Sequence, residues 1–308
     1  MTLTSFTLRN LLRLTALAAL LWTLPPATAQ DQEQEKVWVT HQAARLVVGQ
    51  TSFTRQNPVP SRDSIGAAGG VAVAGNRLFV ADGNRVGAAP ISNRVLIYEN
   101  LSGFVPVPEA TLPQDSDCPS CVGSADVVLG QSGFSTIDPA GGAGMRAPSG
   151  VSSDGQVLAV ADTNNNRVLL WNSIPTSNGV APNVILGQPD ANDSLPRTSR
   201  DGMRGPQGVW VADGTLFVAD TQNSRILIWN NIPTSSGAAP DVVVGQPDFD
   251  SRPEPDLTQS DYEPSAQRLL DPVGVSTKDG KMFVADLGFD RVMIYNTIPT
   301  SNGAAADV

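Results

Sequence analysis

Four aspartates and four arginines recur at matched places in the chain and are its clearest candidates for chemistry. Each aspartate ends a Val-Ala-Asp triplet, and each arginine opens an apolar run further along. The eight residues are Asp82, Asp162, Asp220, Asp286, Arg94, Arg167, Arg225 and Arg291. Carboxylates gathered around one face of a protein can hold a divalent cation, or act as acid and base.

The spacing within each copy favours a structural role for these residues. The arginine follows the aspartate by five positions in three copies and by twelve in the first. That spacing lets the aspartate accept hydrogen bonds from a turn and pair with the arginine across it. An element present in every copy is better suited to building the copies than to a single reaction. We therefore predict no catalytic residue among the eight, and expect Asp162→Ala to lower stability rather than to abolish an activity.

Two further landmarks recur and define the fold class. A Gly-Val step opens each copy, and an aliphatic run ending in Gly-Gln closes it, with the glutamines at Gln50, Gln131, Gln188 and Gln246. Between them lie short β-rich runs separated by Gly, Pro, Asn and Asp, with no helical period of apolar residues. The pattern predicts an all-β protein, a β-propeller of four-stranded blades with four repeat units, the last one incomplete.

The repeats resemble a known family in several motifs at once. The P-x-G-V, V-A-D-x-x-N-x-R-V and V-x-G-Q-P-D patterns resemble NHL repeats of the bacterial exported kind over roughly residues 45–308. The resemblance implies a propeller, often six-bladed, that serves as a binding platform. It implies no single activity, because one fold hosts many functions.

The fourth copy stops before its Gly-Gln close. Asp307 and Val308 match Asp241 and Val242 of the third copy, and nothing follows them. Two interpretations are open. In the favoured one the chain is a piece of a longer protein, and further blades complete a larger ring. In the other, residues 45–50 supply the outer strand of the last blade and close a ring of four.

The N-terminus predicts export. Arg9 and Arg13 precede an apolar stretch over residues 14–24, and Ala27 and Ala29 stand where a signal peptidase reads small residues. We expect residues 1–29 to be a signal peptide, residues 30–44 a lead-in and residues 45–308 the repeats. The apolar stretch is too short for a membrane anchor, which needs about 20 residues. The predicted location is therefore periplasmic or extracellular, with no membrane insertion after cleavage.

The net charge of the chain limits the classes of partner that it can bind. The full chain has 20 basic and 30 acidic residues, and loss of the signal peptide leaves 18 basic residues and a net charge of −12. Binding to nucleic acid depends on Lys and Arg neutralising phosphates, so we predict no nucleic-acid partner. A protein or a glycan is the expected partner.

The only cysteines, Cys118 and Cys121, lie in an insertion of the first copy. In an exported protein this pair predicts a local disulfide. A redox C-x-x-C site expects a βαβ context, and haem attachment needs histidine where Val122 stands. A zinc site would need more ligands than the single histidine, His41, supplies.

Taken together, the sequence favours a binding or scaffold module for protein or glycan partners over an enzyme, with no cofactor. The alternative is a calcium-type metal-dependent hydrolase or lyase whose centre uses carboxylates and asparagines. Because functional sites break the symmetry of a repeat, we expect such a site near the long connection of copy one, residues 83–93, or near the linkers after the glutamines.

Overall fold

The computed structural model describes residues 44, 46–50, 52, 59–83, 92–106, 121–122, 124–137, 144–253 and 263–308. The chain forms two units, Met1–Ala43 and Ala44–Val308, and every described residue belongs to the second. The predicted signal peptide and Cys118 lie outside the described residues, and only the backbone of Cys121 is described. The predicted disulfide and the expected export therefore stay predictions.

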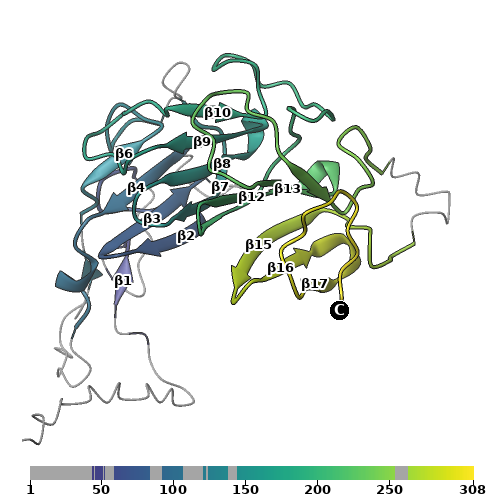
Figure 1. The fold of residues 1–308 in the computed structure, drawn as a ribbon. Coiled ribbons are helices and arrows are strands. Elements are labelled where there is room, and N and C mark those ends of the chain that lie inside the picture. Colours follow the sequence, from purple (N-terminus) through teal and green to yellow (C-terminus); the bar gives the residue numbers. More distant parts are fainter. Residues whose placement is uncertain are drawn as a thin grey trace, which may run out of the picture. The chain divides into compact units, whose positions relative to one another are not determined.

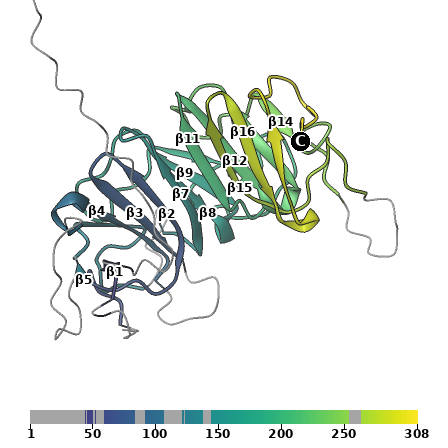
Figure 2. The ribbon, with the colours of Figure 1, turned by 90° about the horizontal axis from the view of Figure 1, so that it is seen from below.

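The described unit is a four-blade β-propeller array of small sheets (Figures 1 and 2). The first blade contains β2 (Ala68–Ala74), β3 (Arg77–Asp82), β4 (Arg94–Tyr98) and β6 (Val127–Leu129). The second contains β7 (Pro148–Ser153), β8 (Leu158–Asp162), β9 (Arg167–Trp171) and β10 (Val184–Leu186). The third contains β11 (Gly208–Ala212), β12 (Thr215–Asp220), β13 (Arg225–Trp229) and β14 (Val242–Val244). The fourth contains β15 (Pro272–Lys278), β16 (Lys281–Asp286) and β17 (Arg291–Tyr295).

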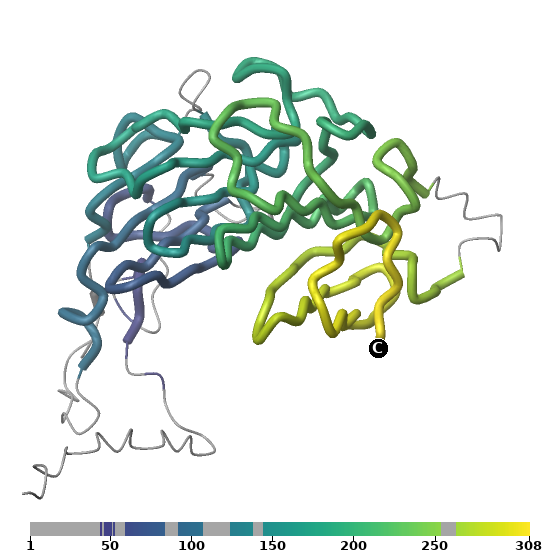
Figure 3. Tube along the Cα trace, in the orientation of Figure 1, coloured from purple at the N-terminus to yellow at the C-terminus, as the bar shows by residue number. Residues whose placement is uncertain are grey.

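All strand pairs within the blades are antiparallel, and each blade follows the order of the sequence. The trace passes from blade to blade in the same order (Figure 3). The strands β8, β9 and β13 are buried along their whole length. Their continuous apolar runs fit strands that are covered on both faces. The predicted all-β propeller is confirmed.

One hydrophobic core fills each junction between neighbouring blades. The first lies between blades one and two and includes Phe79, Ile97, Val151 and Trp171. Two further cores of the same kind lie between blades two and three and between blades three and four. Along each strand, successive side chains point to opposite faces of the blade. The second and third blades therefore contribute side chains to the cores on both of their sides.

The recurring Gly-Val step is explained by close packing of the innermost strands. A Cβ atom on Gly150 would lie 2.4 Å from the carbonyl oxygen of Gln207 in the next blade, and one on Gly70 would lie 2.4 Å from that of Ser149. Real Cβ atoms do not approach oxygen so closely. Glycine at this position therefore lets the inner strands of successive blades meet.

The short 3-10 turns follow the middle strands. They are η3 (Thr163–Asn165), η4 (Thr221–Asn223) and η5 (Leu287–Phe289), with η1 (Leu101–Gly103) after β4. Each of the first three ends in a residue of left-handed conformation, Asn166, Ser224 or Asp290, just before the repeated arginine. No helix among the described residues is long and apolar enough to span a bilayer.

Two features concern the ends of the array. Strand β1 (Val47–Val48) pairs in parallel with β5 (Cys121–Val122), and the sheet of the fourth blade does not include it. At the other end, the Val308 backbone exchanges hydrogen bonds with Ile294 at 2.8 and 3.2 Å. Val242 pairs in the same way with Ile228 in the third blade. The predicted match of the two copies at this point holds, whereas closure of the fourth blade by residues 45–50 of the same chain is not what the structure shows.

Candidate functional site

The aspartate and arginine of each copy form an ion pair inside their blade. In the second blade, Asp162 ends β8 and Arg167 begins β9 directly opposite it. The Arg167 Nε atom donates to the Asp162 Oδ2 atom at 2.7 Å, and both side chains are at most 2% exposed. The Asn165 Nδ2 atom donates to the same oxygen at 2.8 Å, and the Arg146 backbone N–H donates to Oδ1 at 2.7 Å.

The other three pairs repeat this geometry. The Nε to Oδ2 distances for the first, third and fourth blades are 3.0 Å for Arg94 and Asp82, 2.8 Å for Arg225 and Asp220, and 2.8 Å for Arg291 and Asp286. The pairs of the first, second and third blades are almost fully buried. Arg291 differs, because 26% of its side chain is exposed.

Each arginine also fastens loops to its blade. The Arg167 Nη1 atom donates to the Ala191 carbonyl at 2.6 Å, and its Nη2 atom donates to the Gly144 carbonyl at 2.8 Å. Ala191 lies in the linker after the outer strand, and Gly144 lies in the segment before the inner strand. One guanidinium therefore holds the entry and the exit of the blade together.

In the second and third blades the aspartate accepts a hydrogen bond from the turn that follows, as the sequence predicts, and the donors are the Asn165 and Asn223 side chains. The aspartates do not cap the backbone of that turn. The aspartates also accept from the backbone of a residue sixteen positions earlier, as Asp220 does from Arg204 and Asp286 does from Leu270. The carboxylate thus fixes the segment that leads into the inner strand.

The hydrogen bonds that these carboxylates accept, rather than their pKa values, argue against acid–base chemistry or metal binding. Burial raises the pKa of Asp162 and Asp220 above the usual range of an aspartate, and the nearby Arg167 and Arg225 oppose that rise. Both oxygens of each are occupied by protein donors, so a substrate or ion would have to displace them. Among the described residues, no three His, Cys, Asp or Glu side chains lie close enough to share a metal ion.

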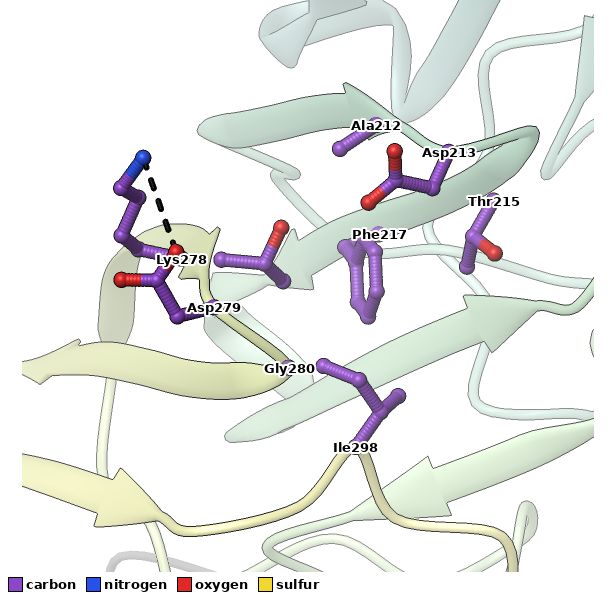
Figure 4. Close-up of a pocket in the computed structure, with 9 residues that line it drawn as sticks. Ala212, Asp213, Thr215, Phe217, Lys278, Asp279, Gly280 and Ile298 are labelled. Carbon is purple, nitrogen blue, oxygen red and sulfur yellow. Dashed lines mark ion pairs between the residues drawn. The ribbon is translucent and has the colours of Figure 1, made fainter.

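A groove between the third and fourth blades offers side chains with free polar atoms. It has a volume of about 350 Å³ and lies where the β11–β12 and β15–β16 hairpin turns approach each other (Figure 4). Its lining is Ala212, Asp213, Thr215, Phe217, Thr277, Lys278, Asp279, Gly280 and Ile298. We call these nine residues the turn groove. The volume is near the lower end of known ligand sites, about 300–1,000 Å³.

The two turns of the groove are built by the same sequence, Asp-Gly. Asp213 and Asp279 both have φ of +51°, and the glycines that follow have φ of +75° and +74°. Positive φ at both central residues defines the two-residue hairpin that the sheet twist favours. Each turn therefore places one carboxylate at the rim of the groove on a short, stiff connection.

The turn groove combines acidic, hydroxyl and apolar groups. Phe217 and Ile298 form its apolar part, with Phe217 only 2% exposed. The Lys278 ammonium lies 3.7 Å from the Asp279 carboxylate, and both side chains are 80% exposed. A pair so well solvated holds its partners weakly, so both groups remain available to a ligand. In the described part of the chain the Asp213 carboxylate has no partner at all.

Broken repeat symmetry marks this junction. Trp210 of β11 lies opposite Phe217 across the hairpin. The residues at the same position as Trp210 in the first and second blades are the small residues Ala72 and Ser152. The indole Nε1 donates to Thr277 Oγ1 of the fourth blade at 2.9 Å. The tryptophan therefore ties the two blades together beside the groove and positions a hydroxyl that lines it.

The sequence predicted a site in other places, near residues 83–93 or near the linkers after the glutamines. Most of the first-copy connection over residues 83–93 lies outside the described residues. The turn groove was missed because its residues come from two hairpins that are far apart in the chain. A usable signal was present, since Trp210 is the one aromatic residue at its repeat position.

A second hollow of about 200 Å³ lies beside the Asp162–Arg167 pair. It is lined by Gly144, Arg146, Asn165, Arg167, Ala191, Asn192, Asp193 and Ser194. Most of its polar groups are already bonded, as Arg167 and Asn165 are to Asp162. The turn groove is therefore the better candidate for a ligand.

Comparison with known proteins does not assign the chain to a family. No protein-family model and no curated protein sequence matches the chain. The computationally designed Ika4 protein is similar over 80% of this chain and 100% of its own, with a TM-score of 0.40 and 8% identity. Kuenenia stuttgartiensis hydrazine synthase is similar over 80% of this chain and 49% of its own, with a TM-score of 0.40 and 10% identity. Myxococcus xanthus glutaminyl cyclase is similar over 80% of this chain and 74% of its own, with a TM-score of 0.35 and 11% identity. The chain thus spans about half of the hydrazine synthase chain, and its propeller architecture rests on its own sheet topology.

Proposed function

We propose that this chain is an exported NHL-repeat propeller that acts as a binding or scaffold module for protein or glycan partners, and that the partner binds in the turn groove. The repeat motifs and the apolar leader support the family and the export. A propeller supports binding in general, and it does not specify a partner.

The observation that carries the proposal is the contrast between two sets of acidic residues. The four repeated aspartates are buried, and their carboxylates are bonded to arginine and backbone donors. Asp213 and Asp279 stand instead at the rim of a groove with an apolar floor. Carboxylates in that setting accept hydrogen bonds from sugar hydroxyls or pair with basic side chains of a protein. No observation on the described residues favours the calcium-dependent hydrolase.

The test is a binding measurement with a charge-matched control. Wild-type protein is immobilised, and its affinity for a panel of extracellular polysaccharides and purified envelope proteins is measured by interferometry. The groove variant is Asp213→Asn/Asp279→Asn. The control variant is Asp250→Asn/Glu263→Gln, because both residues are exposed and neither lines the groove.

We expect a ligand whose affinity falls at least tenfold in the groove variant and is unchanged in the control. Equal affinity for all three proteins would refute the groove as the site. Turnover of a polysaccharide by the wild type would refute the assignment as a binding module.

A further inference from the structure

One repeat position loses its aromatic residue in the second blade. It is the third residue after the glutamine of each Gly-Gln close, and it is phenylalanine in three copies, as Phe53, Phe134 and Phe249, but Ala191 in the second. In the first three blades the repeated arginine donates through Nη1 to the carbonyl at this position, so the backbone is placed alike. The second blade therefore lacks a ring that the first and third blades carry.

In the first and third blades this ring is stacked with an arginine. The guanidinium carbon of Arg62 lies 5.4 Å from the centre of the Phe134 ring, and that of Arg200 lies 4.8 Å from the centre of the Phe249 ring. Both arginines precede the repeated aspartate of their copy by 20 positions, and the second copy has Gly142 there. Gly142 lies outside the described residues, but its sequence supplies no side chain for such a stack.

The hollow of about 200 Å³ lies at the same place in the second blade. Ala191 and Gly144 line it, beside Asn165 and Arg167. Ala191 packs on the core between the first and second blades, just as Phe249 packs into the core between the second and third. The hollow therefore lies where the other blades hold a ring. A cavity of about 150 Å³ is large enough for benzene, so the hollow can accommodate a six-membered ring with a small substituent.

The hollow also has hydrogen-bond donors that no described residue uses. Arg146 is exposed, and within the described part of the chain its guanidinium has no partner; the same holds for the side chains of Asn192 and Ser194. The backbone of Arg146 is fixed on both sides, because its N–H donates to Asp162 Oδ1 at 2.7 Å and its carbonyl accepts from the Asn164 N–H at 3.0 Å. The guanidinium thus extends from a fixed point of the blade, with its N–H donors available to a ligand.

The charge of the hollow favours an anion. The Asp193 carboxylate that lines it is paired with Arg197 at 2.6 Å, and Asp162 behind it is paired with Arg167 at 2.7 Å. Arg146 adds a positive charge that no described carboxylate neutralises. The turn groove, by contrast, has two carboxylates and one ammonium group in its lining. The two sites therefore suit ligands of opposite charge.

We propose that this hollow binds a small aromatic carboxylate. The ring of the ligand lies against Ala191, where the other blades hold phenylalanine, and its carboxylate accepts hydrogen bonds from the Arg146 guanidinium. Asn192 and Ser194 donate to the remaining lone pairs. An aromatic ring is favoured over a sugar ring because Ala191 and Gly144 offer no side-chain partner for ring hydroxyls. The site lies in the linker after a repeated glutamine, and it is independent of the turn groove.

Fluorine NMR on the wild-type chain tests the ligand class with three probes. para-Fluorobenzoate carries the ring and the carboxylate, para-fluorobenzyl alcohol carries the ring without the charge, and trifluoroacetate carries the carboxylate without the ring. We expect para-fluorobenzoate to saturate one site per chain and the other two probes to bind at least tenfold more weakly. Absence of saturable binding by para-fluorobenzoate, or equal affinity for either of the other probes, would overturn the proposal.

Two variants and a matched control test the location. Ala191→Phe introduces the residue of the other copies and fills the hollow, so para-fluorobenzoate should bind at least tenfold more weakly while the Tm does not fall. Arg146→Gln should weaken binding as much, and because Arg146 is exposed the variant should fold normally. Arg204→Gln removes the arginine at the matching position of the third blade and should keep the wild-type affinity. Wild-type affinity in Arg146→Gln or in folded Ala191→Phe, or an equal loss in Arg204→Gln, would refute the site.

Discussion

Removal of the buried Asp162 carboxylate should destabilise the protein strongly. In Asp162→Ala the Arg167 charge stays inside the second blade at 2% exposure, and the Arg146 N–H and the Asn165 amide lose their acceptor. Breaking a buried pair by removing one partner costs about 3–5 kcal/mol. For a domain of this size that corresponds to a fall in Tm on the order of 10 °C.

The fourth blade supplies the internal comparison. Asp286→Ala removes the same carboxylate, but Arg291 is 26% exposed and its charge reaches water. We therefore expect a smaller loss of about 1–2 kcal/mol, mainly from the Leu270 N–H that loses its acceptor. The difference between the two losses reports the burial of the arginine together with the Asn165 hydrogen bond, because Phe289 holds the matching position in the fourth blade.

Urea unfolding followed by tryptophan fluorescence measures both losses, because Trp171 and Trp229 are buried in the blades. A double-mutant cycle with Arg167→Met should give a coupling of about 1–3 kcal/mol, so the double variant loses less than the sum of the single variants. Equal losses for Asp162→Ala and Asp286→Ala, or no loss for either, would refute the role of buried pairing.

Three further predictions concern packing, ionisation and the cysteines. Gly150→Ala should cost about 1–3 kcal/mol because its Cβ would strike the Gln207 carbonyl, whereas Gly133→Ala, which meets nothing within 4 Å, should be close to neutral in the same urea experiment. Burial raises the pKa of Tyr98 above its ordinary value, so its contribution to stability is present below about pH 10 and is lost as the pH rises through the folded pKa. The unfolding free energy should therefore fall above pH 10 by more in the wild type than in Tyr98→Phe, and equal slopes would contradict this. The intact mass of the exported protein should rise by the mass of two hydrogen atoms when a reductant cleaves a Cys118–Cys121 disulfide, and an unchanged mass would exclude the bridge.

Much of the fold could be predicted because the repeats carry it locally. The Val-Ala-Asp triplet, the arginine and the apolar run belong to one hairpin, and the structure pairs Asp162 with Arg167 directly across it. The Gly-Val step was visible as a landmark, but its reason was not, since it depends on the carbonyl of a neighbouring blade.

The parts that could not be predicted depend on contacts between distant segments. The aspartates bond to backbone sixteen residues upstream, and this offset is constant in all four copies, from Asp82 and Gly66 to Asp286 and Leu270. A constant offset does not by itself reveal a contact. The turn groove needs two hairpins brought together by blade packing, and the only trace of it in the sequence was Trp210.

Ligand affinity and melting temperature, measured together in two variants, distinguish the repeated aspartates from the aspartates of the turn groove. If the repeated aspartates build the blades and the turn groove binds the partner, as we propose, the variants should separate the two properties. Asp162→Ala, assayed below its melting temperature, should keep the wild-type affinity despite a lower Tm. Asp213→Asn/Asp279→Asn should keep the wild-type Tm and lose affinity at least tenfold. Loss of binding in folded Asp162→Ala, with full binding in the groove variant, would contradict the claim.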